Sequence, residues 1–196
     1  MSAPVWAGAQ QQEILAASVQ ATLQKAISDS PSSESSFAST DERSRWITEM
    51  AARLVKRMPD SRERVDFLET VHYEATRAGL DPQLVLGLIE VESGFHKYAV
   101  SSAGARGYMQ VMPFWVAQIG ASGQNLFHLR TGLRYGCTIL RHYLDMEHGD
   151  LYRALGRYNG SLGRPEYPNM VRAAWEKNWS YKSQQLAESA SPIAAR

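Results

Sequence analysis

The sequence predicts an all-α protein: a globular helical domain preceded by a flexible N-terminal segment. Apolar residues recur every three or four positions from residue 46 onward, which is the period of an amphipathic helix. Capping residues precede these stretches, and glycine or proline follows them. No stretch alternates apolar and polar residues as a half-buried strand does. With 44% hydrophobic and 21% charged residues, the composition is typical of a folded globular protein.

The chain is expected to divide into three parts. Residues 1–40 are predicted to be an N-terminal segment, largely disordered or loosely helical, because residues 10–29 are rich in Ala and Gln and residues 29–36 form a Ser-rich linker. Residues 41–182 are predicted to form one folded domain, since 196 residues suit a single core. Residues 183–196, polar and Ala-rich, are expected to be a disordered tail.

Two helices are expected in the first part of the domain. The first covers residues 46–55 and ends before Pro59, and its apolar stripe consists of Trp46, Met50 and Leu54. The second starts at the acid-x-x-Glu pattern of residues 60–63 and continues to Gly79. His72 lies on the apolar face of the second helix, which favours a core histidine over a metal ligand.

The middle of the chain predicts a short apolar helix, a loop and another helix. Asp81 and Pro82 form a helix-opening pair, and the helix they open stops at Gly94. Residues 94–108 are rich in Gly, Ser and Ala and suit a loop or a small irregular hairpin. A helix is expected to resume near Pro113, and residues 120–124 break it.

Three more helices are expected toward the C-terminus. Residues 131–144 carry an apolar stripe that includes Cys137, which is interpreted as a buried small hydrophobe. Asp150 caps a short helix that ends near residue 158. A last helix is expected to follow Pro168 and to end near residue 178.

The helix over residues 82–93 carries two acids whose surroundings differ. Two residues on a helix are about 200° apart, so Glu90 and Glu92 do not share a face. Glu90 follows the polar face and is expected to be solvated, whereas Glu92 continues the apolar stripe. A desolvated carboxyl has a pKa above its free value of about 4.3, as a general acid near neutral pH requires. The pattern fits equally well a Glu92 that marks the edge of the stripe and turns to water.

A long acid-free segment follows Glu92. Residues 93–144 contain no Asp or Glu but include five basic residues: Lys97, Arg106, Arg130, Arg134 and Arg141. This segment suits a groove for a polyanionic glycan-peptide, and it offers no second carboxylate. Glycosidases that hydrolyse usually need two carboxyl groups. With one carboxyl group in the protein, the substrate must supply the second reacting group. An N-acetylated sugar does so when its acetamido oxygen attacks the anomeric carbon.

Three blocks of this sequence resemble a known family. Residues 92–95 read ESGF, residues 101–113 read SSAGARGYMQVMP, and residues 158–160 read YNG. Together they resemble the signature of the soluble lytic transglycosylases, whose catalytic domain is lysozyme-like. The resemblance covers roughly residues 80–175, and its second block is long and ordered enough to be specific.

The resemblance implies a role for several residues. Glu92 takes the catalytic acid/base position. The expected substrate-binding residues are Ser101, Gln110, Met112, Tyr158 and Asn159. Met112 fits a core position as well as a groove position, whereas a glutamine in an apolar run needs a hydrogen-bonding reason to be there.

This chain departs from the family pattern at two places. The tyrosine motif usually reads Ala-Tyr-Asn-Ala-Gly, and here it reads RYNGS over residues 157–161. A leucine usually precedes Met-Gln, and here Tyr108 stands in its place. Both changes affect which part of the glycan is bound more than they affect the reaction.

The resemblance therefore implies cleavage of the bond between N-acetylmuramic acid and N-acetylglucosamine in peptidoglycan, with a 1,6-anhydro end as product. Two alternatives stay open: a goose-type lysozyme that uses water, and a glycan-binding or scaffold protein without turnover. The resemblance names peptidoglycan strands as the partner. It names no protein partner, and a monomer is compatible with the sequence.

Other classes of function are disfavoured. The five histidines show no His-x-x-x-His or helical His-Glu pairing, and no Gly-rich phosphate loop is present, so we expect no metal and no cofactor. The net charge of +1 does not indicate nucleic acid, and no apolar run is long enough to span a membrane. A peptidoglycan substrate implies export to the periplasm. The small-x-small run Ala7-Gly8-Ala9 fits the end of a signal peptide whose front lies outside this chain.

Overall fold

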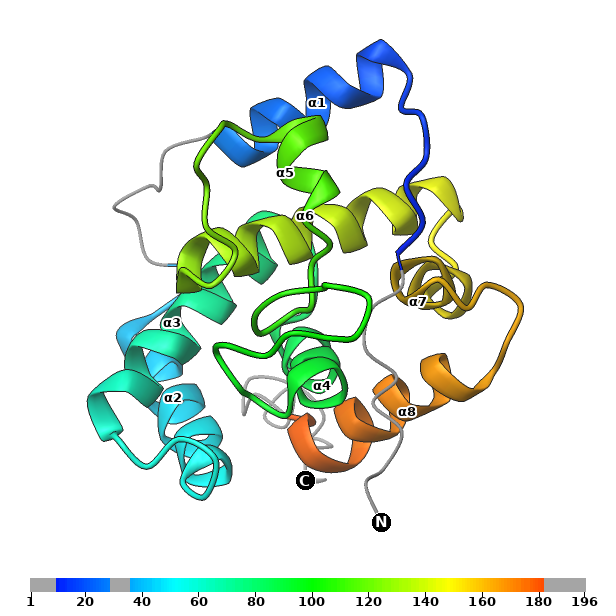
Figure 1. The fold of residues 1–196 in the computed structure, drawn as a ribbon. Coiled ribbons are helices and arrows are strands. Elements are labelled where there is room, and N and C mark those ends of the chain that lie inside the picture. The colour runs from blue at the N-terminus through cyan, green and yellow to red at the C-terminus, as the bar shows by residue number, and fades with distance from the viewer. Residues whose placement is uncertain (1–9, 29–35, 182–196) are drawn as a thin grey trace, which may run out of the picture.

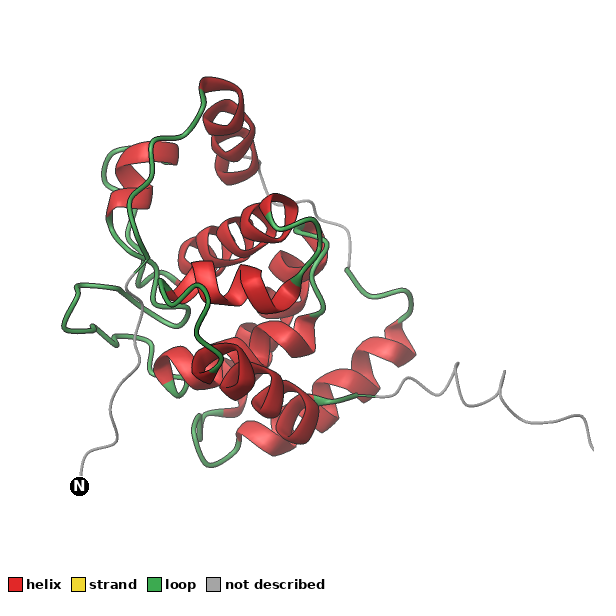
Figure 2. Cartoon of the chain, turned by 90° about the vertical axis from the view of Figure 1, so that its right-hand side faces the viewer, coloured by secondary structure: helices red, strands yellow, loops and turns green. Residues whose placement is uncertain are grey.

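A computed structural model describes residues 10–28 and 36–181. These residues form helices that are joined by loops (Figure 1). The elements in chain order are α1 (Ala17–Ser28), α2 (Thr40–Leu54), α3 (Ser61–Arg77), α4 (Pro82–Ser93), α5 (Phe114–Ile119), α6 (Leu129–Met146), α7 (Leu151–Asn159), α8 (Glu166–Ala174) and a terminal π-helical turn, η1 (Trp175–Trp179). No strand occurs in the described residues, as Figure 2 shows. The all-α prediction is confirmed.

Helix α4 lies at the centre of the fold. Its residues from Leu84 to Ile89 are all buried, so the helix is apolar on every side and must be surrounded. It packs against α3, α8 and η1. Gly87 allows the closest of these approaches, because a Cβ there would come within 2.8 Å of the Trp175 backbone nitrogen. The last turn of α4, which carries Glu92, is thus held between helices from both halves of the chain.

The predicted helix caps are confirmed. Asp60, Asp81 and Asp150 each accept a hydrogen bond from a backbone N–H of the first turn that follows. Gly94 ends α4 in the left-handed conformation, with φ of 56°. The last helix begins at Glu166, so Pro168 lies inside its first turn, where proline is tolerated.

Helix α6 forms a second long axis of the fold (Figure 1). It packs against α3, α7 and α1, and most of its residues are buried. Cys137 is buried within it, as predicted, and burial raises the pKa of its thiol. Within the described residues, no helix combines the length and the apolar composition needed to span a membrane.

Helix α1 packs on this body through Leu23 and Ile27, against α5 and α6. Two arginines also bind its C-terminal carbonyls: Arg77 donates to Ala26 at 2.8 Å and Arg134 to Ile27 at 3.4 Å. The domain boundary at residue 41 stays a prediction, although α2 begins beside it. Residues 29–35, the tail 183–196 and the Ala7-Gly8-Ala9 run lie outside the described residues.

His72 is half-buried and packs against aromatic rings, which agrees with the structural role expected for it. Its ring stacks on Phe37, with 3.6 Å between centroids, and its Nδ1 lies 2.7 Å from the Ser36 hydroxyl. Burial lowers the pKa of His72 from 6.5 to about 4. The unfolded chain therefore binds a proton on this ring at a pH where the folded protein does not.

We expect acid to destabilise the fold through His72. The stability that the neutral ring contributes is complete above pH 6.5 and is lost as the pH falls toward 4, by about 1–2 kcal/mol after allowance for partial solvent access. His72→Phe keeps the stacked ring and removes the titration, so its free energy of unfolding should change less between pH 6.5 and 4. Urea melts of both chains measure this, with the exposed His128→Gln as control. If the free energy of unfolding fell equally with pH in wild type and in His72→Phe, the acid effect would not come from His72.

Candidate active site

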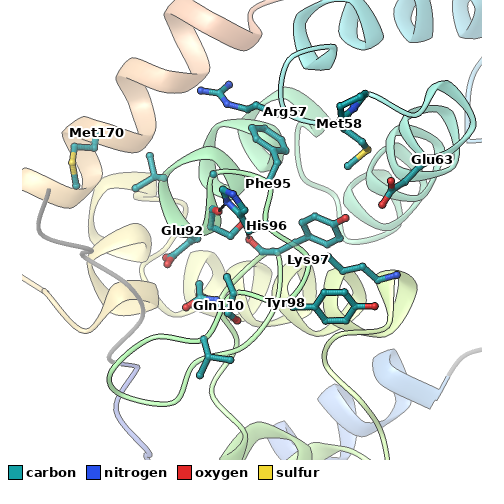
Figure 3. Close-up of a pocket in the computed structure, with 17 residues that line it drawn as sticks. Arg57, Met58, Glu63, Glu92, Phe95, His96, Lys97, Tyr98, Gln110 and Met170 are labelled. Atoms are coloured by element: carbon teal, nitrogen blue, oxygen red, sulfur yellow. Dashed lines mark hydrogen bonds between the residues drawn. The ribbon is translucent and has the colours of Figure 1, made fainter. Parts of the chain in front are cut away.

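A cavity of about 860 Å³ opens at the C-terminal end of α4. Its walls are the last turn of α4, the loop that follows it, the turn between α2 and α3, and Met170 of α8. Figure 3 shows the labelled side chains around it, with Glu92 between Met170 and Gln110. The cavity is therefore built by segments that are far apart in the sequence. They meet at the end of α4, because α4 packs against α3 and α8.

Glu92 lies at the inner surface of this cavity, and its residue is only 2% exposed. The hydroxyl of Tyr167, from α8, donates a hydrogen bond of 2.5 Å to its Oε1. Of the two interpretations that the sequence left open, the structure thus favours a carboxyl that continues the apolar stripe. Burial stabilises the protonated form of such a carboxyl, and the tyrosine hydroxyl provides a donor when the proton leaves.

Two tyrosine hydroxyls flank this carboxyl and stay protonated. Burial raises the pKa of Tyr167 well above 10, and the charge of Glu92 and the hydrogen bond to it raise it further. The pKa of Tyr158 is also raised well above 10, by burial and then by Glu92. Both side chains are therefore neutral hydrogen-bond donors rather than bases.

Glu90 is not solvated, and the prediction for it is wrong. Its side chain is only 15% exposed and forms an ion pair with Arg57 at 2.8 Å. Asn178 and Trp179 of the C-terminal turn also donate to its carboxylate. The helical pattern within α4 could not reveal these partners, because they come from the turn after α2 and from η1. Glu90 therefore fastens α4 to its neighbours, and Glu92 faces the cavity.

Gln110 lies at the cavity with Glu92. It has a φ of 48°, it is 1% exposed, and its Nε2 donates to the carbonyls of Ala99 and Gly107 at 3.1 and 2.9 Å. These bonds are the hydrogen-bonding reason that the sequence required. They brace the loop after α4, in which Arg106 forms isolated bridges with Val100 and Val111. The loop is thus the small irregular hairpin that the sequence allowed.

The other four expected substrate-binding residues do not line this cavity. Ser101 is 9% exposed, and its hydroxyl accepts a hydrogen bond from the Ala105 N–H at 3.1 Å, within the hairpin. Met112 is half-buried. Tyr158 is fully buried and donates to the Met109 carbonyl at 2.8 Å, and its neighbour Asn159 is also buried. The structure therefore brings Glu92 and Gln110 together at one cavity, with Tyr158 behind Glu92.

The basic residues of the acid-free segment do not form a common groove, which corrects the prediction. Arg134 is buried in an ion pair with Glu74 at 3.0 Å, and Arg130 lies 3.6 Å from the same carboxylate. Arg141 forms an ion pair with Asp145 on its own helix. Of the five, only Lys97 lines the cavity. Acids outside the segment pair with Arg130, Arg134 and Arg141, and a count of charges along the chain cannot show this.

The sequence interpretation missed several residues of the site. Tyr167 had no signal, because it lies 75 positions from its partner Glu92. Glu63 was also missed, since the search for a second carboxylate covered residues after Glu92 and this one comes from α3. Figure 3 shows Glu63 and Glu92 on opposite sides of Phe95 and His96. Tyr98 was missed as well. It lines the cavity and is 71% exposed, and the sequence does not show that this aromatic ring faces solvent.

Comparison with known proteins agrees with this geometry. The model of the Transglycosylase SLT domain family matches residues 69–178, more than half of the chain. Similar proteins include the membrane-bound lytic murein transglycosylase C of Actinobacillus pleuropneumoniae serotype 5b, 45% identical over 35% of this chain and 19% of that protein. The transglycosylase of Enterobacteria phage PRD1 is 31% identical over 50% of this chain and 36% of that protein.

The matched regions thus cover well under two thirds of these relatives. No solved structure matches the chain. The matched part nevertheless includes α4, the hairpin, α7 and α8, which carry Glu92, Gln110, Tyr158 and Tyr167. The chain belongs to the Transglycosylase SLT domain family.

Proposed function

We propose that the protein is a peptidoglycan lytic transglycosylase that cleaves the β-1,4 bond between N-acetylmuramic acid and N-acetylglucosamine. The observation that carries this proposal is the buried Glu92, held by Tyr167 at the inner surface of an open cavity. The names of the relatives agree with it: one is called a murein transglycosylase and another a transglycosylase. The reaction joins carbon and oxygen atoms of one sugar and uses no water.

In the first step, protonated Glu92 donates its proton to the glycosidic oxygen, and the bond from this oxygen to the anomeric carbon breaks. The acetamido oxygen of the same muramic acid attacks that carbon. In the second step, the Glu92 carboxylate takes the proton of the 6-hydroxyl, and the 6-oxygen displaces the acetamido oxygen. Glu92 ends protonated, and the sugar carries a 1,6-anhydro ring.

Tyr167 fits this cycle because Glu92 changes charge twice. A neutral hydroxyl donor favours the carboxylate that forms after the first proton transfer. The apolar burial of Glu92 favours the acid that starts each cycle. The two influences oppose each other, as a group that must act in turn as acid and base requires.

The rest of the cavity suits a glycan that carries acidic stem peptides. Tyr98 presents an exposed aromatic ring at the rim, a surface on which sugar rings pack. The Lys97 ammonium lies 5.5 Å from the centre of that ring and offers a cation to a peptide carboxylate. We propose that these two residues bind the strand beside the cleaved bond. Ser101, Met112 and Asn159 remain proposed groove residues, on the resemblance alone.

The proposed substrate implies a place of action. Peptidoglycan lies outside the cytoplasmic membrane, so we propose that the protein acts in the periplasm. The relative from Actinobacillus pleuropneumoniae is named as membrane-bound, which agrees with a role in the cell envelope.

Mass analysis of the products tests the reaction. Purified sacculi are digested with the protein, and soluble fragments are separated and weighed. We expect fragments that end in 1,6-anhydromuramic acid, each one water lighter than the product of hydrolysis. Fragments that carry the extra water would contradict the proposal and indicate a goose-type lysozyme. Binding to sacculi without released fragments would indicate a scaffold protein.

Glu63→Gln is the control that separates the two enzyme reactions further. Glu63 is the acid other than Glu92 that lines the cavity, so a hydrolase built on two carboxylates would depend on it. For a lytic transglycosylase we expect the variant to keep its rate within about threefold, because the substrate supplies the second group. Glu63 is exposed at the start of α3, so this change should not unfold the protein. Loss of turnover in Glu63→Gln would favour hydrolysis.

A further inference from the structure

Gln10 stands out in the described N-terminal residues because it is buried while its neighbours are exposed. It is 4% exposed, and residues 11–14 are all exposed. Its Oε1 accepts two hydrogen bonds, from the Met112 N–H at 3.2 Å and from the Trp115 indole N–H at 3.1 Å. A polar side chain from an otherwise exposed segment thus fills a site with two convergent donors.

The Gln10 site is linked to the proposed catalytic carboxyl through Tyr158. Burial and then Glu92 raise the pKa of the Tyr158 hydroxyl, and Gln10 lowers it, so both side chains act on this hydroxyl. Met112 is two positions after Gln110, which lines the cavity with Glu92. Tyr158 therefore has Gln10 and Glu92 as neighbours. Gln10 itself does not line the cavity, so its site is a separate one that shares Tyr158 with Glu92.

Further contacts hold the segment in place. We call residues 10–16 the strap. Figure 1 shows it, in dark blue, leading from α1 past the end of α6 toward α7. Gln118 of α5 donates to the Glu13 carbonyl at 2.9 Å, and the Glu13 carboxylate lies 3.5 Å from Arg157 of α7. Apart from Gln10 these contacts are exposed or half-buried, so they hold the strap weakly.

We propose that the strap is self-inhibitory and that Gln10 competes with the glycan for the Met112 and Trp115 donors. This inference rests on the proposed function. The Gln10 side chain ends in a carboxamide, and its carbonyl presents to these donors the same group that an N-acetylated sugar carries. A strand that extends past Glu92 on this side takes the place of Gln10 and gives the two donors its own acetamido oxygen.

The energetics favour exchange over permanent closure. A buried indole N–H and a partly buried backbone N–H without an acceptor destabilise the protein, so the site is filled either by Gln10 or by a substitute acceptor. The exchange costs the hydrogen bonds of one glutamine and weak surface contacts. The strap therefore lowers the fraction of molecules that are ready to bind, and the apparent KM rises by the inverse of that fraction. Once the strap has left, the chemistry at Glu92 is unchanged.

Gln10→Ala tests this competition. The steady-state rate is measured on soluble, uncross-linked peptidoglycan strands, and the Kd is measured for a chitin oligomer, which carries the same acetamido groups. We expect the substitution to lower both KM and Kd by about threefold to tenfold and to leave kcat within about twofold. Gln11→Ala, at an exposed neighbouring position, should leave all three constants unchanged.

A merely structural role for Gln10 gives a different result. The melting temperature of Gln10→Ala would then fall while its KM and Kd stay at wild-type values or rise, and either outcome overturns the proposal. The Kd does not depend on turnover, so the strap and the reaction are tested separately. Tighter oligomer binding without any anhydro product from either chain would uphold the strap and contradict the proposed reaction. Anhydro products from both chains, with the same KM and Kd in wild type and Gln10→Ala, would uphold the proposed reaction and contradict the strap.

Discussion

Glu92→Gln is expected to lower turnover of peptidoglycan by at least about 10³-fold, because one side chain serves as acid and then as base in the proposed cycle. Glutamine keeps the shape of the side chain and can accept the hydrogen bond from Tyr167, so the fold should survive. Binding to sacculi should also survive, since the groove walls are unchanged. Release of anhydro fragments, followed by mass spectrometry, measures the first effect, and co-sedimentation with sacculi measures the second.

The matched control for this variant is Glu90→Gln. It makes the same replacement of a carboxylate by a carboxamide at the other acid of α4. That carboxylate binds Arg57, Asn178 and Trp179 instead of facing the cavity. We expect a lower melting temperature and turnover close to wild type. If Glu90→Gln lost as much activity as Glu92→Gln while both proteins stayed folded, the assignment of the reacting carboxyl would be wrong.

Tyr167→Phe is expected to lower kcat by about 10- to 100-fold, with little change in KM. The variant removes one hydrogen bond to a carboxylate, worth about 1.5–3 kcal/mol, and this bond is strongest when Glu92 is charged. A loss confined to the charged state falls on kcat. Steady-state rates on soluble peptidoglycan strands measure both constants.

The pH profile distinguishes a positioning role of Tyr167 from a structural one. Without the tyrosine hydroxyl the Glu92 carboxylate loses a hydrogen-bond donor, so its acid form persists to higher pH. The alkaline limb of the pH–rate profile therefore shifts to higher pH. A tyrosine that only filled space would leave this limb in place, because phenylalanine fills nearly the same volume. Tyr152→Phe, at a hydroxyl that donates to a surface carbonyl, is the control.

Local chemistry made much of the fold predictable. Asp60, Asp81 and Asp150 cap helices because a short side chain can reach the free N–H groups of the turn that follows, and this needs no distant residue. Gly94 ends α4 for a similar reason, since its left-handed conformation is easy only for glycine.

The errors in the sequence interpretation share one cause. Glu90 was expected in water because it follows the polar Gln83 on α4, but its partners come from the turn after α2 and from η1. Arg134 was expected in a groove because its own segment lacks acids, but Glu74 of α3 neutralises it inside the protein. The environment of a charge depends on what packs against its helix, and periodicity reports only which face is covered.

The sequence by itself determined that this chain is helical, where most helices begin and end, and that Glu92 and Gln110 belong to the motifs of one family. These features follow from backbone capping, from the 3.6-residue period and from ordered motifs, all of which act over a few positions. Only the tertiary structure decided that Tyr167 holds Glu92, that Glu63 shares the cavity, and that Gln10 fills the site beside it. Each of these pairs joins residues that are distant in the chain, and the packing of α3 and α8 on α4 and of Gln10 on α5 places them together.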